Sequence, residues 1–331
     1  ADKGGDELNH LFVRELDGTV KDLTPGDNLK AIFGGWIGDG EAFFAFTNER
    51  DARFFDLYRY DSADYSRTLV FKNDAGFSID ATNRQGTRAA AVKERTSADN
   101  NIFLIDLTAP EAEPLLVTPH EGNISHSVHD FTADGTKLVF GTDEHGEFAQ
   151  AWTFDIASGE KAPLIEAAWD VMYVLYSPSG RYCVSATNED ASTVVSIVDR
   201  KSGKAVAMPK GLPSGDINGV RFSRDEKSVA FMLNSDVSPS NVITIDLKKK
   251  KFKQWTQALN PAIDPGDLVE NDVVRYRSFD GLEIPSILYK PKGASASNPA
   301  PAVVLVHGGP GGQTRAGYSA MVQHLVNHGY A

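Results

Sequence analysis

The sequence has 331 residues, enough for two domains with separate hydrophobic cores or for one large repeat architecture. It is acidic: 33 Lys and Arg face 45 Asp and Glu, which gives a formal net charge of −12. A surface of that sign repels phosphate backbones and anionic lipids, so we expect no nucleic-acid partner and no membrane partner. No stretch reaches the ~18 apolar residues of a membrane-spanning helix.

Two local features of the composition also have structural interpretations. The single cysteine, Cys183, excludes an internal disulfide framework. It lies in an apolar run, where a small buried core residue is the expected role. The basic run Lys248–Lys251, continued by Lys253, stands between two strand-like segments, and we interpret it as a solvated turn rather than a binding patch.

A short strand that ends in Asp recurs six times. Its copies end at Asp17, Asp61, Asp106, Asp155, Asp199 and Asp246, with spacings of 44, 45, 49, 44 and 47 residues. A second element, a strand, a polar turn and another strand, recurs five times at nearly the same spacing. Its turns contain Gly40, Gly86, Gly135, Gly180 and Glu226. Glycine suits such turns because it accepts a positive φ without a Cβ clash.

Four short strands in each repeat of about 40–50 residues are typical of a β-propeller blade. We therefore predict an all-β propeller over residues 1–258 with about six visible blades. Because there are only five of the preceding hairpins, we expect the first blade to lack its inner strands and the chain to be a fragment without its upstream residues. An irregular β-sandwich does not explain the even spacing, and a βαβ fold needs helical patterns that do not occur before residue 310.

From Asn260 the repeat stops. Proline and glycine at 261, 265 and 266 indicate a linker, and two strand-like runs follow, joined at Asp280–Gly281 as a hairpin. The continuous apolar run Ala302–Val306 is typical of a strand buried on both faces. It leads into the glycine turn His307–Gly312, and apolar residues at helical spacing then predict a helix over Ser319–Asn327. Residues 259–331 are therefore predicted to begin an α/β-hydrolase domain.

The glycine turn has a chemical interpretation. Fixed backbone N–H groups can stabilise the oxyanion that forms when a carbonyl is attacked, and glycine lets the backbone approach closely. A His-Gly-Gly turn after a buried strand matches the loop that donates one such N–H in α/β-hydrolases. A phosphate loop and a dinucleotide fingerprint both lack their required residues here, and a tight turn without chemistry is the remaining alternative.

These motifs together resemble the prolyl oligopeptidase family of serine peptidases, especially its acylaminoacyl-peptidase and dipeptidyl-peptidase-like branches. The segment Ser278–Pro285 resembles the entry into that family's hydrolase domain, and His307–Pro310 is the most specific match. The resemblance covers essentially the whole chain. It implies that the backbone N–H of Gly309 helps to bind the oxyanion, and that His307 is a structural residue of the turn rather than the catalytic base.

The resemblance places the Ser-His-Asp triad beyond Ala331, and the candidates inside the chain do not fit it. Ser319 lacks the closing glycine and the preceding strand of a nucleophile elbow, so it is interpreted as the start of the helix. His324 and His328 are four residues apart but have no accompanying Glu as in a zinc protease. The cluster His120, His126 and His129 is interpreted as polar residues of a blade loop, and we expect no metal site.

The sequence thus predicts a serine peptidase that hydrolyses short peptides or acyl-peptides without a cofactor, with the propeller restricting substrate access. The chain of 331 residues is expected to be inactive because it contains no activated nucleophile. An esterase or acyl hydrolase of the same fold and a non-catalytic propeller that binds a ligand are the alternatives. A homo-oligomer, the compartment, the cleavage preference and the total number of blades are left open.

Overall fold

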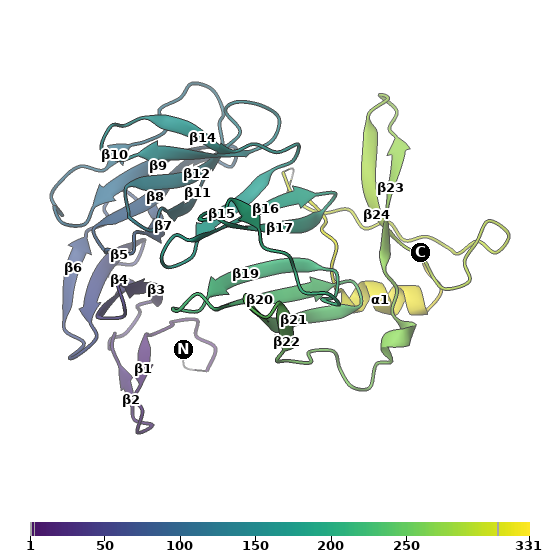
Figure 1. Ribbon diagram of the computed structural model, residues 1–331, viewed down its shortest axis with the longest axis horizontal. Helices are drawn as coiled ribbons and strands as arrows, with labels where there is room; N and C mark the ends of the chain where they lie inside the picture. The colour runs from purple at the N-terminus through teal and green to yellow at the C-terminus, as the bar shows by residue number, and fades with distance from the viewer. Residues whose placement is uncertain (1, 3, 310) are drawn as a thin grey trace. The chain divides into compact units, whose positions relative to one another are not determined.

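The computed structural model describes residues 2, 4–309 and 311–331, and its described part contains five four-stranded antiparallel sheets and two two-stranded ones (Figure 1). Pro310 of the predicted motif lies outside the described residues. We number the four-stranded sheets blade 1 to blade 5 in chain order. In each blade the strands follow one another in sequence order, as consecutive antiparallel neighbours do in a propeller.

The bounds of the strands follow the predicted repeat. Blade 1 contains β3 (Ala31–Ile37), β4 (Ala42–Asp51), β5 (Phe54–Asp61) and β6 (Arg67–Phe71), and blade 2 contains β7 (Ser78–Thr82), β8 (Arg88–Thr96), β9 (Asp99–Asp106) and β10 (Leu115–Leu116). Blade 3 contains β11 (His126–Phe131), β12 (Lys137–Thr142), β13 (Gln150–Asp155) and β14 (Lys161–Ile165). Blade 4 contains β15 (Val171–Tyr176), β16 (Tyr182–Glu189), β17 (Ser192–Asp199) and β18 (Lys204–Ala205). Blade 5 contains β19 (Asp216–Phe222), β20 (Ser228–Ser235), β21 (Ser238–Asp246) and β22 (Lys251–Gln254).

The propeller prediction is confirmed, but the count of about six blades is wrong, because five are found. The first copy of the repeat forms only the two-stranded sheet of β1 (Phe12–Arg14) and β2 (Val20–Asp22). This hairpin packs its apolar residues near Phe43 and Tyr60 of blade 1. A pair of strands covers less of the neighbouring sheet than a full blade does, and Phe33 and Trp36 of β3 are 45% and 58% exposed.

The recurring Asp residue has a structural reason. In blades 1 to 5 it is the last residue of the third strand, and its carboxylate accepts a hydrogen bond from the backbone N–H two residues further on, at 2.8–3.1 Å. Asp17 makes the same bond to Thr19 in the turn between β1 and β2. An Asp side chain that bonds the backbone two residues ahead mimics a turn, so it ends the strand and begins the connection to the next one.

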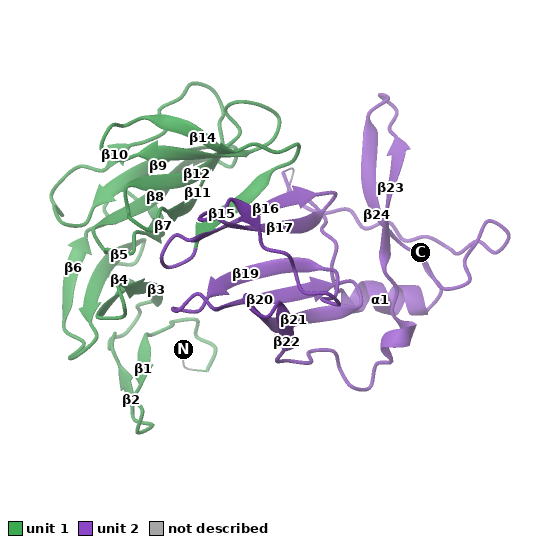
Figure 2. Cartoon of the chain, viewed as in Figure 1, with its two compact units in different colours: residues 1–176 green, residues 177–331 purple. Residues whose placement is uncertain are grey.

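The chain divides into two compact units, residues 1–176 and 177–331 (Figure 2), and the division falls after β15 of blade 4. In the first unit the core lies between neighbouring blades. Ala89 and Ala91 of β8 pack into one cluster with blade 1 residues that include Phe44, while Ala90 and Val92 pack into another with blade 3 residues. Successive side chains of a strand point to opposite faces, so β8 contributes to both cores, and its small residues let the sheets approach closely.

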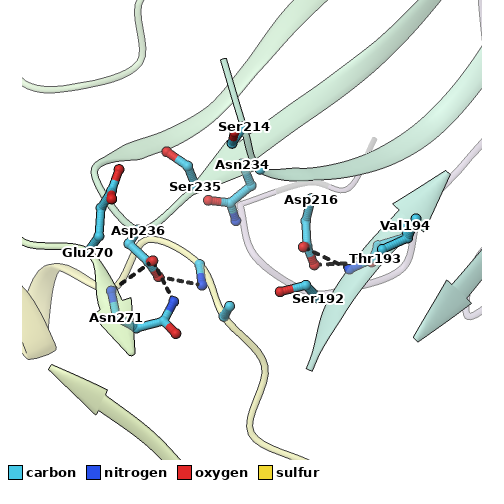
Figure 3. A pocket seen from close by; sticks show the side chains of 13 residues that line it. Ser192, Thr193, Val194, Ser214, Asp216, Asn234, Ser235, Asp236, Glu270 and Asn271 are labelled. Carbon is cyan, nitrogen blue, oxygen red and sulfur yellow. Dashed lines mark hydrogen bonds between the residues drawn. The ribbon is translucent and has the colours of Figure 1, made fainter. Parts of the chain in front are cut away.

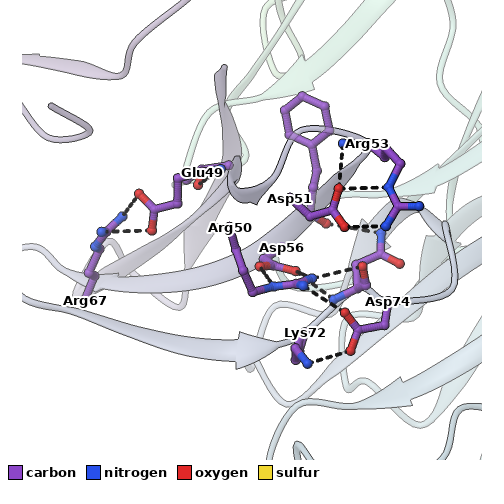
Figure 4. Close-up of polar contacts among 11 residues, drawn as sticks. Glu49, Arg50, Asp51, Arg53, Asp56, Arg67, Lys72 and Asp74 are labelled. Atoms are coloured by element: carbon purple, nitrogen blue, oxygen red, sulfur yellow. Dashed lines mark hydrogen bonds and ion pairs between the residues drawn. The ribbon is translucent and has the colours of Figure 1, made fainter. Parts of the chain in front are cut away.

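A buried carboxylate is bonded near the turn between β4 and β5 of blade 1 (Figure 4). Asp56 on β5 is fully buried, and the guanidinium of Arg50 on β4 donates to both its oxygens, at 2.6 and 2.7 Å. The backbone N–H of Asn73 adds a third bond, at 2.8 Å. A buried charge requires such partners, because an unpaired carboxylate in the interior is costly. Asp74 on the following loop also contacts Arg50, at 2.8 Å, so this cluster ties the hairpin of β4 and β5 to the connection between blades 1 and 2.

The C-terminal part of the second unit contains a short 3-10 turn (Pro265–Asp267), the hairpin of β23 (Asn271–Arg277) and β24 (Glu283–Tyr289), and the helix α1 (Ala320–Asn327). The predicted hairpin and helix are confirmed. Ser319 is the N-cap of α1, since its hydroxyl accepts from Val322 N at 3.3 Å. None of the described helices is long and apolar enough to cross a membrane.

Lys248–Lys250 form the exposed turn between β21 and β22, as expected for a solvated run. The prediction that Cys183 is buried is wrong, because it is only partly buried on β16. Its neighbours Tyr182 and Val184 occupy the buried face of that strand, which leaves Cys183 on the other face.

Removal of a core side chain between blades tests this packing. Leu138 on β12 is fully buried in the cluster between blades 2 and 3, so Leu138→Ala should lower the free energy of unfolding by about 2–5 kcal/mol. Leu115 on β10 is 52% exposed, and Leu115→Ala should cost less than about 1 kcal/mol. The two variants are compared by urea unfolding followed by circular dichroism; equal effects would contradict a core at this position.

Candidate functional site

The glycine turn predicted to bind an oxyanion lies at the surface of the second unit. Gly309 has a φ of +87°, a left-handed conformation that glycine adopts readily and other residues do not. The side chain of His307 contacts the carbonyl oxygen of Gly308 through Nδ1, at 3.2 Å, so it bonds within the turn. The role of Gly309 in binding an oxyanion stays a prediction.

The strand expected before this turn is not formed. Residues 302–306 are irregular, and Val304 and Val306 are 83% and 85% exposed. The expected α/β-hydrolase part is therefore not present as a sheet in this structure. A strand of this kind needs a backbone partner on each side and cover on both faces, and the described residues offer this run only a bond from Val303 N to Ala331 O, at 2.8 Å.

A pocket with a volume of about 410 Å³ lies in the second unit (Figure 3). Its walls come from the turns at the ends of blades 4 and 5, from the start of β23 and from the segment before α1. The lining residues are Ser192, Thr193, Val194, Ser214, Gly215, Asp216, Asn234, Ser235, Asp236, Glu270, Asn271, Ala316 and Gly317. The pocket is thus polar and acidic. Its lining combines residues of the propeller with residues that follow the glycine turn.

Asp236, in the turn between β20 and β21, lies on one wall of the pocket. Its carboxylate accepts four hydrogen bonds: from the backbone N–H and side-chain amide of Asn271 at 3.1 and 2.5 Å, from the hydroxyl of Tyr289 at 2.5 Å, and from Gly317 N at 3.0 Å. Burial, reinforced by the neighbouring carboxylate, raises the pKa of Tyr289, so its hydroxyl remains a donor. One side chain of blade 5 therefore binds β23, β24 and the segment before α1.

Arg315 makes the corresponding connection to blade 4. Its guanidinium donates to Asn188 Oδ1, to Thr193 Oγ1 at 2.7 Å and to Asp216 Oδ2 at 3.3 Å. Asp216 also accepts from the backbone N–H and hydroxyl of Thr193, at 2.9 and 3.1 Å. Charge-assisted bonds of this kind are about twice as strong as neutral ones, and the fork of donors fixes the orientation of the arginine.

The helix α1 contributes a third connection. Gln323 is buried, and its amide donates to the carbonyl oxygens of Asp236 at 3.0 Å and of Val269 at 2.8 Å. Its side-chain oxygen accepts from Val269 N at 3.0 Å. All the polar atoms of this buried amide are therefore used, which locks the helix onto the linker and onto the turn of blade 5.

The interpretation of His120, His126 and His129 as polar residues of a blade loop is wrong for two of them, because His126 and His129 lie on β11 and only His120 lies in the connection before that strand. His120 contacts Asp99 Oδ1 at 2.9 Å, and His126 contacts the carbonyl oxygen of Asn100 through Nδ1 at 3.0 Å. Within the described part of the chain, the buried Nε2 of His126 and Nδ1 of His129 have no hydrogen-bond partner. Burial lowers the pKa of both rings, to about 4 for His129.

Metal-ligating residues do not gather anywhere in the described residues: no group of three or more His, Cys, Asp or Glu side chains could hold a metal ion. The rings of His324 and His328 lie 4.1 Å apart on α1, and His328 contacts the carbonyl oxygen of His324 through Nδ1 at 2.8 Å. This second histidine is therefore already bonded to the end of its own helix.

Comparison with known families identifies the propeller. Residues 1–258 match the model of the prolyl oligopeptidase N-terminal β-propeller domain. The chain belongs to the prolyl oligopeptidase family. The resemblance to this family is thus confirmed, and the matched residues contain the blade repeat but not the glycine turn.

Individual relatives of this prolyl oligopeptidase-family chain are peptidases by name. Dipeptidyl aminopeptidase BIII of Pseudoxanthomonas mexicana is 29% identical over 344 residues, an alignment that covers 100% of this chain and 49% of the relative. The chain thus spans about half the length of that curated relative. A puromycin-hydrolysing peptidase of Mycobacterium tuberculosis has a similar structure, with a TM-score of 0.79 at 14% identity over 98% of this chain and 53% of that one. A prolyl endopeptidase structure gives a TM-score of 0.69 at 16% identity, over 91% and 45% of the two chains. At these identities the structural likeness shows the fold alone.

No motif or repeat in the sequence points to Asp236 or Arg315. Both lie outside the repeat and outside the glycine motif, in turns where a polar residue is ordinary. The stretch Asn234-Ser235-Asp236 between two apolar strands indicates a turn, but it does not show which donors reach that turn. Their partners lie 35 to 127 residues away in the sequence, so only the fold shows the network.

The buried histidines predict an acid-sensitive blade 3. His129 stays neutral in the folded protein down to a pKa of about 4, whereas an unfolded histidine takes up a proton near pH 6.5. Between these values the unfolded state binds more protons, so stability is complete above pH 6.5 and falls as the pH drops towards 4, by about 3 kcal/mol at most. Urea unfolding of His129→Gln over this range should show a smaller loss, whereas His145→Gln, at an exposed histidine, should leave the loss unchanged. A full loss in His129→Gln would refute the assignment.

Proposed function

We propose that this chain is part of a serine peptidase that hydrolyses short peptides or acyl-peptides. The observation that carries the proposal is the match of residues 1–258 to the prolyl oligopeptidase propeller. The name of the dipeptidyl aminopeptidase relative supports it. The left-handed conformation of Gly309 in an exposed glycine turn is compatible with an N–H that points at a substrate oxygen.

The proposed reaction follows the chemistry of a Ser-His-Asp triad that lies beyond Ala331. The serine Oγ attacks the carbonyl carbon of the scissile bond while the histidine takes its proton, and the oxyanion of the tetrahedral intermediate is held by Gly309 N–H and a second donor. The histidine then protonates the leaving amine, and water hydrolyses the acyl-enzyme. The propeller limits access to short or unfolded peptides. No metal or cofactor enters this scheme.

The first test compares the chain with the full-length protein. The chain of 331 residues should release no more p-nitroaniline from peptide p-nitroanilides than buffer does, because it contains no triad, whereas the full-length protein should release it. Matched ester substrates distinguish a peptidase from an esterase by the ratio of the kcat/KM values. Hydrolysis of esters alone would favour the acyl hydrolase, and a full-length protein inactive on both would favour a non-catalytic propeller.

The second test concerns the oxyanion donor. Gly309→Ala in the full-length protein forces a side chain into a φ of +87° and displaces the N–H, so kcat should fall about 10²–10³-fold, the effect of losing one oxyanion donor. Gly293 provides a control, since its φ is +85° and a Cβ there meets nothing within 4 Å. Gly293→Ala carries the same backbone strain outside the turn and should leave kcat within about threefold of wild type. Equal kcat values in the two variants would rule out the role of Gly309.

A further inference from the structure

The segment directly after the glycine turn is bound to the propeller. We infer that Arg315 and Asp236 are positioning residues, which fix this segment on the turns of blades 4 and 5 and thereby set the position of the Gly309 N–H. This inference rests on the proposed function, because it assigns the two residues to the support of the proposed oxyanion donor. It makes part of the propeller a structural support of the reaction centre, in addition to a barrier to large substrates.

Residues 313–316 are hydrogen-bonded to blades 4 and 5. Arg315 reaches Asn188, Thr193 and Asp216, which come from three strands of blades 4 and 5. Asn188 in turn donates to Gln313 Oε1 at 2.8 Å, and Ala316 N donates to the carbonyl oxygen of Ala191 at 3.0 Å. Arg315 is thus the centre of a set of bonds that begins four residues after Gly309.

The turns that receive these bonds are well defined. Between β16 and β17, Asp190 and Ala191 have φ values of +45° and +65°, the left-handed pair of a two-residue hairpin turn whose twist matches its strands. At Gly215, before β19, a Cβ would lie only 2.2 Å from the carbonyl oxygen of Asn234. Gly215 thus lies directly against the end of β20 within blade 5. Thr193 N of blade 4 donates to Asp216 Oδ1 of blade 5 at 2.9 Å, so the two residues that bind Arg315 are also bonded to each other.

Asp236 holds the other end of the same segment. Its Oδ1 accepts from Gly317 N at 3.0 Å, and Asn234 Oδ1 accepts from Tyr318 N at 3.1 Å. The hydroxyl of Tyr289 donates to Asp236 Oδ1 at 2.5 Å, and its oxygen also lies 3.3 Å from the carbonyl oxygen of Gly317. With Gln323 bound to the same turn, the propeller contacts Gln313 and each of the residues 315–318 before α1 begins.

The side of the turn that precedes Gly309 has a different environment. Leu305 and Val306 are 55% and 85% exposed, so in this structure the run before the turn is not packed into a core. An oxyanion donor acts only when its position is fixed before the reaction, and a displacement of about 1 Å can cost roughly 10²-fold in rate. Within the described part of the chain, the bonds of Arg315 and Asp236 are therefore the contacts that hold the turn in place, through the segment that follows it.

The test uses the full-length protein and three variants. Arg315→Gln and Asp236→Asn remove the two connections, and Arg181→Gln is the matched control. Arg181 pairs with Asp199 at 2.8 Å and also belongs to the β16–β17 region, but it lies at the opposite end of these strands from Asn188. The first readout is hydrogen–deuterium exchange of the amides of residues 307–318. The second is kcat and KM on a peptide p-nitroanilide, together with the Ki of a peptide aldehyde whose tetrahedral adduct places its oxygen in the oxyanion site.

We expect exchange over 307–318 to be at least about 10-fold faster in Arg315→Gln and Asp236→Asn than in wild type, and unchanged in Arg181→Gln. The kcat should fall about 10–100-fold with KM within about threefold, and the aldehyde Ki should rise by the same factor as kcat falls, because the lost support acts on the transition state. If the two residues only stabilised the fold, the variants would lower the melting temperature, but kcat and the aldehyde Ki would not change by the same factor.

Each other outcome decides the matter. Unchanged exchange in both variants would overturn the inference, whatever the activity. Faster exchange with unchanged kcat and Ki would also overturn it, since the connection would not position the donor. If the wild-type protein hydrolyses neither amides nor esters, the proposed function fails; faster exchange in the two variants would then still establish the anchoring, and unchanged exchange would refute it.

Discussion

The fold depends on sheets that are apolar on both faces. In β8 the even and odd side chains enter two different cores, so blade 2 is stable only with a neighbour on each side. This requirement explains the near-constant spacing of the repeat, because each blade must offer the next one a sheet of similar size. It also explains why Phe33 and Trp36 are exposed where blade 1 meets only the short hairpin of β1 and β2.

Because the cores lie between the sheets, side chains in the turns of the blades can form hydrogen bonds with other parts of the chain. The core fixes the strands, so a side chain in a turn such as Asp236 is held by its strands without being buried among apolar residues. Such a turn can collect donors from other parts of the chain at little cost in conformational entropy. Asp216 and Asp236 are used in this way, one by Arg315 and the other by β23, β24 and the segment before α1. The propeller thus supplies hydrogen-bond acceptors to the hairpin of β23 and β24 and to the segment after the glycine turn.

The sequence predicted the features that recur in the repeat and the features that depend only on neighbouring residues. The Asp that ends the third strand, the glycine turns and the cap at Ser319 are decided within a few residues, and the structure confirms them. The number of blades was overestimated, because the first copy has the pattern of a strand without the partners of a blade. The run 302–306 has the composition of a buried strand, but composition does not provide a neighbouring strand. Arg315 could not be predicted, since its partners are about 100 or more residues away.

The acidic residues of the pocket beside these turns are better explained by the contacts between the propeller and the chain around α1 than by a ligand site. A cation or an ammonium group would need free carboxylate oxygens, yet two of the three carboxylates that line the pocket are already engaged: Asp236 accepts four hydrogen bonds, and Asp216 accepts from Thr193 and Arg315. A ligand that displaced these donors would leave them unpaired, at about 1–3 kcal/mol for each buried one. The same bonds join two blades to the chain around α1, so the polarity of the pocket follows from the connection that it contains. Asp216 and Asp236 of the pocket connect the propeller to the segment after Gly309.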